Sequence, residues 1–105
     1  MQHVDSLELI DRVTSFAESA LTIAGRPTSG NARLRLSDAN HLLTLEITHR
    51  DDRTFDVVLH DGSAMQALDD LRRWSTHAGC IFVAERGPRD ELRVNIVLNA
   101  EAIRV

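Results

Sequence analysis

Five histidines are the first candidates for chemistry, because imidazole nitrogens bind metal ions and transfer protons near neutral pH. They are His3, His41, His49, His60 and His77. A zinc site needs three or four converging ligands, usually including a pair at short spacing on a helix or strand. The histidines form no such pair, and the strand pattern described below predicts opposite sheet faces for His49 and His60. We therefore predict no metal site and no cofactor.

His77 and Cys80 could in principle act as a base and a nucleophile, because they lie three residues apart. A reactive thiolate is favoured near positive charge or at a helix N-terminus. Cys80 instead follows the C-terminus of a predicted helix, where the dipole opposes a thiolate. The paired carboxylates at 51–52, 69–70 and 90–91 fall in turns or on a solvated helix face, not in a cleft. The sequence predicts no catalytic residue and favours a non-catalytic protein over an enzyme.

Arginine side chains remain as candidates for binding. All 12 cationic residues of the chain are arginine. Arg33 and Arg35 project from one face of a predicted strand, and Arg86, Arg89 and Arg93 surround the last predicted turn. A patch that combined two such groups could bind an acidic peptide or a phosphate group, because guanidinium pairs well with both.

Two helices are predicted to position these residues. Residues 6–24 and 64–78 carry apolar side chains at helical spacing. Ser63 is placed to cap the second helix, and Gly25 and Gly79 are placed to end the first and the second.

Strand patterns fill the remainder of the chain. Residues 32–37, 43–49 and 54–60 predict an antiparallel meander, and residues 80–84 and 92–98 predict two more strands. The run 80–84 is apolar throughout, which is typical of a strand covered on both sides. The element order is therefore α-β-β-β-α-β-β. The simplest layering for this α+β fold is a five-stranded antiparallel sheet with both helices on one face.

Cross-strand register predicts which side chains share a face of this sheet. Pairing Leu36 with Leu43 and Leu34 with Leu45 keeps four apolar side chains together, toward the helices. The same rule, extended to residues 54–60, predicts which side chains lie on the opposite face of the sheet. We predict that this second face binds a partner through Arg33, Arg35, Thr44, Glu46, Val58 and His60. Val58 and Val97, with Phe82 as a further candidate, would be apolar groups on it and indicate a homodimer.

Size and charge limit the function classes. A chain of 105 residues corresponds to one domain, residues 1–105. Its net charge of −4 argues against nucleic-acid binding and favours a cationic protein partner. No apolar run approaches the roughly 20 residues of a membrane span. The lone cysteine, Cys80, excludes an intrachain disulfide and fits a reducing cytoplasm.

These observations predict a cytoplasmic, non-catalytic protein-binding or regulatory module of the chaperone, adaptor or inhibitor type, acting as a homodimer. The order helix, three strands, helix, two strands resembles that of type III secretion chaperones, which are small acidic homodimers that hold extended effector segments. The alternative is a small-molecule binding protein or small enzyme with its site between the helices and the sheet. That site would be lined by His49, Trp74, His77 and Cys80.

Overall fold

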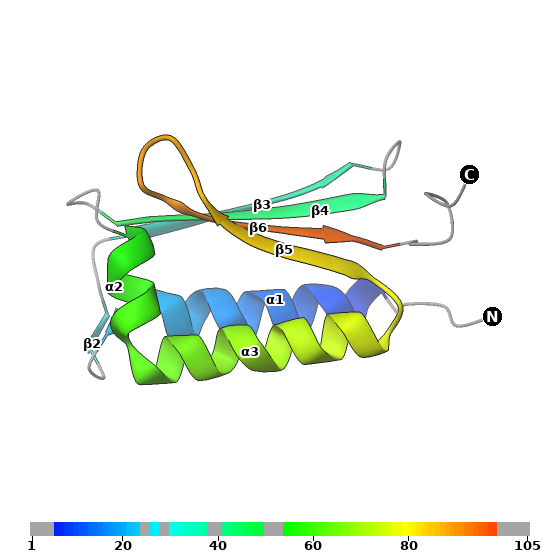
Figure 1. Cartoon of the computed structure of the whole chain (residues 1–105), viewed down its shortest axis with the longest axis horizontal. Helices are drawn as coiled ribbons and strands as arrows, with labels where there is room; N and C mark the ends of the chain where they lie inside the picture. The colour runs from blue at the N-terminus through cyan, green and yellow to red at the C-terminus, as the bar shows by residue number, and fades with distance from the viewer. Residues whose placement is uncertain (1–5, 24–25, 28–29, 38–40, 50–53, 99–105) are drawn as a thin grey trace.

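The computed structural model describes residues 6–23, 26–27, 30–37, 41–49 and 54–98, which form a helical layer packed on an antiparallel sheet (Figure 1). The helices are α1 (Ser6–Ala20), α2 (Thr54–His60) and α3 (Gly62–His77). The sheet contains β3 (Gly30–Ser37), β4 (Leu42–His49), β5 (Ile81–Arg86) and β6 (Leu92–Val97). A separate short pair consists of β1 (Thr22–Ile23) and β2 (Arg26–Pro27). The fold class is α+β, as predicted.

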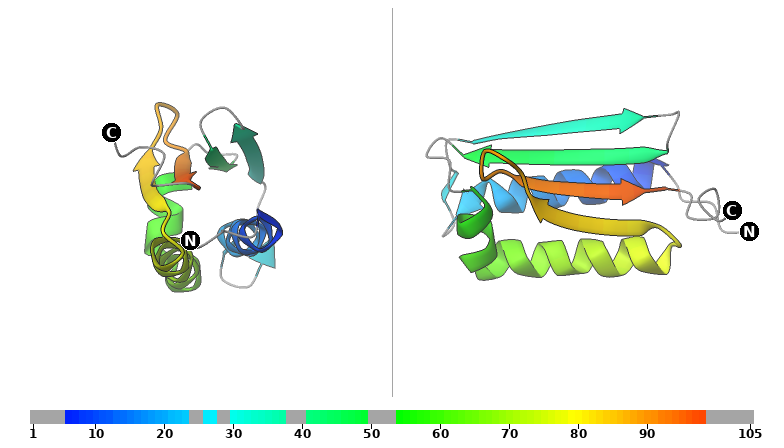
Figure 2. Two further views of the ribbon diagram at one scale, coloured as in Figure 1. Left: turned by 90° about the vertical axis from the view of Figure 1, so that its right-hand side faces the viewer. Right: turned by 45° about the horizontal axis from the view of Figure 1, so that its top comes forward.

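The strand order is β3-β4-β6-β5, with every neighbouring pair antiparallel. The predicted register of the first hairpin is confirmed, because Leu36 pairs with Leu43 and Leu34 with Leu45. β4 and β6 are central, while β3 and β5 form the two edges of the sheet (Figure 2).

The core lies between the sheet and the long helices. The inward apolar side chains of β4 and β6 are at most 2% exposed: Leu43, Leu45, Ile47, Leu92, Val94 and Ile96. They meet the apolar sides of α1 and α3, which pack against each other below the sheet (Figure 2). In the described part of the chain no element covers the opposite face, which we call the outer face.

The prediction of a strand at residues 54–60 is wrong, because this segment forms α2. Its pattern also fits a helix, since the buried Thr54 and Val58 are four residues apart. The Thr54 hydroxyl oxygen accepts a hydrogen bond from the His49 backbone N–H at 2.5 Å, which holds α2 against the end of β4. β6 pairs with the second edge of β4 instead, so the main sheet has four strands and the described chain has three helices. The element order that resembled type III secretion chaperones is therefore not the observed one.

Other boundaries differ in detail. α1 ends at Ala20 rather than at residue 24, because β1 follows almost at once. α3 is capped by Asp61 rather than Ser63: the carboxylate accepts a hydrogen bond from the Ala64 backbone N–H at 3.0 Å. Gly79 adopts the left-handed conformation (φ +87°) expected just after a helix.

The strand predicted at residues 80–84 is present as β5, but the prediction that it is covered on both sides is wrong. β5 is an edge strand, and Ile81 and Val83 are 42% and 46% exposed. Phe82 pairs with the buried Ile96 and thus lies on the helix side of the sheet, not on the outer face.

Candidate protein-binding surfaces

The outer face is organised in three cross-strand rows. The first is largely apolar and runs through Ser37, Leu42, Val97 and Ile81. The middle row runs through Arg35, Thr44, Asn95 and Val83, and the third runs through Arg33, Glu46, Arg93 and Glu85. The charges of the third row alternate in sign, which is the favourable cross-strand arrangement.

Polar contacts lie within these rows and, at Arg35 and Glu46, between two of them. The Arg35 guanidinium lies 3.0 Å from the Glu46 carboxylate, and that of Arg93 lies 3.8 Å from the same group. The Thr44 hydroxyl donates to the Asn95 side-chain oxygen at 3.0 Å. Exposed ion pairs of this kind contribute little to stability, so their main effect is to orient side chains.

A hollow of about 300 Å³ opens on the outer face beside the β5–β6 hairpin. Its lining consists of Asn31, Arg33, Glu46, Thr48, Pro88, Arg89, Glu91 and Arg93. We call it the outer-face hollow. It brings Arg33 from the first predicted arginine group together with Arg89 and Arg93 from the second.

Glu91 forms the floor of the outer-face hollow and is 4% exposed. Its carboxylate accepts a hydrogen bond from the Arg89 backbone N–H at 2.9 Å and lies 3.3 Å from the Arg93 guanidinium. A Cβ atom at Gly87 would lie 1.7 Å from Glu91 Oε1, so a larger residue there would displace this carboxylate from its present position. Arg33 and Arg89 form no side-chain ion pair within the described residues, so their guanidinium groups are open to an external carboxylate.

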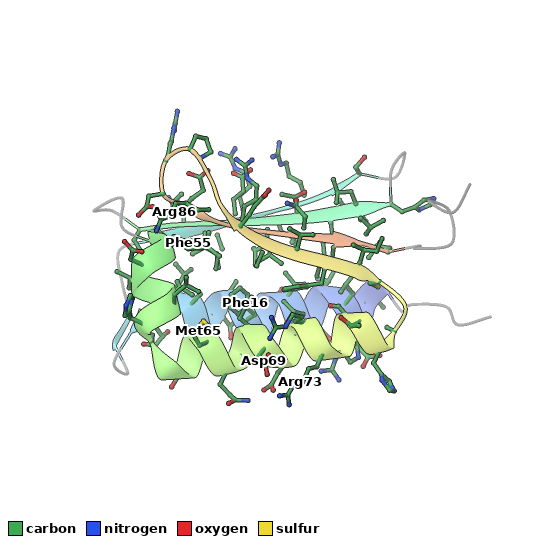
Figure 3. All side chains as sticks on the ribbon, viewed as in Figure 1. Phe16, Phe55, Met65, Asp69, Arg73 and Arg86 are labelled. Atoms are coloured by element: carbon green, nitrogen blue, oxygen red, sulfur yellow. The ribbon has the colours of Figure 1, made fainter. Side chains whose placement is uncertain are left out.

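Arg86 does not join this cluster. It points to the helix side of the sheet, where its guanidinium lies 2.8 Å from the Asp56 carboxylate and 2.9 Å from that of Asp90. It also stacks over the Phe55 ring at 4.7 Å from the centroid (Figure 3). Arg86 thus ties α2 to the end of β5.

Four of the six residues of the predicted partner surface lie together on the outer face: Arg33, Arg35, Thr44 and Glu46. The placement of the other two was wrong because residues 54–60 are helical. Val58 is fully buried, and the exposed His60 belongs to α2, where its Nδ1 lies 2.7 Å from the Asp56 carbonyl oxygen. The role of this surface in binding stays a prediction.

The residues of the alternative site do not converge. Ile81 pairs with Val97 and Val97 with Leu42, so Cys80 is level with the start of β4, two strands away, whereas His49 ends β4. Seven residues of strand separate the two positions by about 23 Å.

The four side chains also differ in their surroundings. His77 is exposed. Trp74 is half-buried, and the Arg12 guanidinium carbon lies 4.8 Å from the centroid of its ring. His49 is 7% exposed, as its predicted inward orientation requires, and neither ring nitrogen has a hydrogen-bond partner in the described structure. Burial raises the pKa of the Cys80 thiol, which opposes formation of a reactive thiolate.

Sequence patterns missed the exposed apolar side chains at the sheet edges. Leu34 and Leu36 of β3 lie on the helix side of the sheet, yet they are 38% and 47% exposed. Ile81 and Val83 of β5 are similarly exposed on the outer face. The strand order decides which strands are edges, and local patterns carry no signal for that order. Of the residues that the last hairpin contributes to the outer-face hollow, Glu91 was missed for the same reason.

A second hollow, of about 370 Å³, lies between α1 and α3 on their solvent side. Its charged lining consists of Glu8, Asp11, Arg12 and Asp70. Among the residues that the structure describes, no group of three or more His, Cys, Asp or Glu side chains is placed to hold a metal ion. None of the described helices combines the length and apolarity needed to cross a membrane.

Comparison of the chain with protein-family models, with curated proteins and with solved structures finds no match.

Proposed function

We propose that this protein is a non-catalytic protein-binding module, of the chaperone, adaptor or inhibitor type, and that it acts as a homodimer. One observation carries the proposal: within the described structure, the sheet is open on its outer face and at both edges. Open edges present unpaired backbone N–H and C=O groups to other chains, and proteins commonly use them for recognition. The single free cysteine is consistent with a reducing compartment such as the cytoplasm.

β5 is the edge suited to self-association. In an antiparallel pair of two β5 strands, Phe82 can face Phe82 of a second copy while Val83 faces Ile81. This register opposes no like charges and buries the exposed Ile81 and Val83. The apolar row through Leu42 and Val97 continues from the same edge, so the contact extends onto the outer face.

The outer-face hollow favours a second candidate function, the binding of a small anion. Its volume of about 300 Å³ lies at the lower end of the usual range for ligand sites. Arg33 and Arg89 supply open guanidinium groups, which bind carboxylates and phosphates. The hollow lies on the outer face, whereas the sequence placed a ligand site between the helices and the sheet.

Sedimentation velocity over a wide range of protein concentration tests the homodimer. We expect a species of twice the 11.7 kDa chain mass that dissociates on dilution. A monomer at all concentrations would contradict the dimer. If the monomer also failed to bind any protein while phosphate or a dicarboxylate raised its melting temperature, the small-anion candidate would replace the proposed function.

A further inference from the structure

β3 is an eight-residue edge strand with a regular division between its two faces. All eight residues pair with β4 on one side, and no described strand pairs with the other side. Arg33 and Arg35 project onto the outer face, while Leu34 and Leu36 project toward the helix side and remain exposed. The helical layer therefore leaves the apolar side of β3 uncovered.

The arginines oppose pairing of β3 with a second copy of itself. An antiparallel pair must place outward residues opposite outward residues. If the pair is centred on Leu34, Arg33 of each copy faces Arg35 of the other. If it is centred on the residue before or after Leu34, Arg33 faces Arg33 or Arg35 faces Arg35. Each central register thus opposes like charges, which destabilises a strand pair.

We propose that β3 binds an extended segment of a partner protein as a fifth, antiparallel strand, and that acidic and apolar residues alternate in this segment. The inference rests on the proposed protein-binding function and names the partner's chemistry. Acidic side chains of the segment pair with Arg33 and Arg35 on the outer face. Its apolar side chains cover Leu34 and Leu36 on the helix side.

The arginines are prepared for this contact in different ways. The Arg35 guanidinium is held 3.0 Å from Glu46 while its side chain stays 64% exposed, so it is oriented and still has donors for a second carboxylate. Arg33 forms no side-chain ion pair among the described residues. An acidic segment therefore gains one preoriented partner and one open partner.

The chain's net charge of −4 does not oppose this proposal. Salt screens exposed charges beyond about 8–10 Å, so the charges next to a bound strand dominate its binding. The charged side chains of β3 itself are Arg33 and Arg35, both positive. Acidic segments are therefore favoured at this edge, although the whole chain is acidic.

A labelled heptapeptide, acetyl-Thr-Val-Glu-Val-Glu-Val-Thr-amide, is the probe for this site. Titration into the full chain, followed by fluorescence anisotropy, should show saturable binding that weakens with salt. Hydrogen exchange should show new protection in β3. A peptide with glutamine in place of both glutamates should bind about tenfold more weakly, because two cross-strand ion pairs are lost.

Backbone methylation of the peptide tests strand addition on the unaltered protein. Alternate amides of an added strand point toward β3, and the others point away. Methylation of one alternate set should abolish binding, whereas methylation of the other set should leave it within about twofold. Equal effects of the two sets would contradict strand addition.

Charge reversal tests the assigned arginines. The variant Arg33→Glu/Arg35→Glu should lose binding of the acidic peptide and gain binding of the peptide with lysine in place of glutamate. The variant Arg72→Glu/Arg73→Glu is the matched control, because it makes the same charge change at two exposed arginines of α3, of which Figure 3 labels Arg73. Equal loss in both variants, or no rescue by the lysine peptide in a folded variant, would overturn the inference.

The outcome for β3 can be separated from that for the protein-binding function. If the peptide protects β5 or the outer-face hollow instead of β3, the assignment to β3 is wrong while protein binding stands. If a natural partner binds the wild type and the Arg33→Glu/Arg35→Glu variant equally, the same conclusion follows. If the peptide binds β3 and no natural protein partner exists, the proposed function is wrong and only the chemistry of the edge is right.

Discussion

The two edges of the sheet, β3 and β5, expose similar fractions of their apolar side chains but differ in charge. On β3, Leu34 and Leu36 alternate with two arginines. On the outer face of β5, Ile81 and Val83 are followed by one charged residue, Glu85. A strand with like charges in its middle repels its own copy and attracts an acidic strand, whereas an apolar strand accepts its own copy. On the two proposals above, β5 would bind a second copy of the chain and β3 an acidic segment of a partner.

The largest predicted effect separates an edge position from its neighbour in the core. Leu34 and Leu45 are paired across β3 and β4, but Leu45 is 2% exposed and Leu34 is 38% exposed. Leu45→Ala should lower the free energy of unfolding by about 3 kcal/mol, because it leaves a cavity. Leu34→Ala should cost about 1 kcal/mol or less, because water already reaches the side chain.

Urea unfolding of both variants, followed by circular dichroism, measures this difference. We also expect Leu34→Ala to weaken binding of the acidic heptapeptide, which would show that Leu34 serves recognition more than stability. Similar destabilisation by the two substitutions would mean that the edge of β3 is part of the core.

The second largest predicted effect concerns β5, the apolar edge of the sheet. Val83→Arg should weaken the homodimer by about 2 kcal/mol or more, because it sets a cation against Ile81 at both ends of the two-fold contact and removes apolar area. Sedimentation velocity should then show a monomer at concentrations where the wild type is dimeric. Asn31→Arg adds the same charge to the exposed outer face of β3 and is the control. Equal dissociation in both variants would place the dimer contact elsewhere than β5.

Removing the charge difference between β3 and β5 should let both edges pair with a second copy of themselves. In the variant Arg33→Val/Arg35→Val, β3 becomes an apolar edge like β5, and the gain from each self-contact is about 1 kcal/mol. Two self-pairing edges on one chain allow an open array, so assemblies larger than a dimer are expected. Light scattering during size-exclusion chromatography would detect them. The control Arg72→Ala/Arg73→Ala should keep the wild-type mass, and no growth in the test variant would show that other features block β3.

Several parts of this fold were predictable from local patterns. The apolar stripe of α1 and the alternation in β3 and β4 each allow one economical arrangement, and the pairing of Leu36 with Leu43 follows from them. The common face of Arg33, Arg35, Thr44 and Glu46 follows from the same register.

The remaining parts depend on contacts between distant segments. Residues 54–60 satisfy both strand and helix spacing, and the choice is made by β6, which occupies the open side of β4. Tertiary pairing outweighs the weak local preference of so short a segment. The pairing of β6 with β4 also makes β5 an edge, leaves residues 54–60 as a helix that buries Val58, and brings Arg89 over the outer face. No pattern within residues 54–60 could have indicated these consequences.

The smallest predicted effect uses Cys80, which immediately precedes β5, as a reporter on that edge. Burial raises the pKa of its thiol, and the thiol can donate to the Leu98 carbonyl oxygen at 3.8 Å only while protonated. A thiol reagent should therefore label the folded chain slowly at neutral pH, with a rate that rises at more alkaline pH than for a free cysteine.

The raised pKa of the Cys80 thiol also sets the sign of a pH effect on the stability of the fold. Because the folded pKa is raised, the contribution of the thiol to stability is complete below the unfolded pKa and is lost as pH rises through the folded pKa. Cys80→Ala should remove this alkaline loss.

If β5 forms the dimer contact, labelling of Cys80 should slow further as protein concentration rises, and Val83→Arg should abolish that dependence. The acidic heptapeptide should leave it unchanged, because β3 lies at the other edge of the sheet. Concentration-independent labelling of a wild-type dimer would place its contact away from β5, and the two edges would then lose their distinction as self-binding and partner-binding strands.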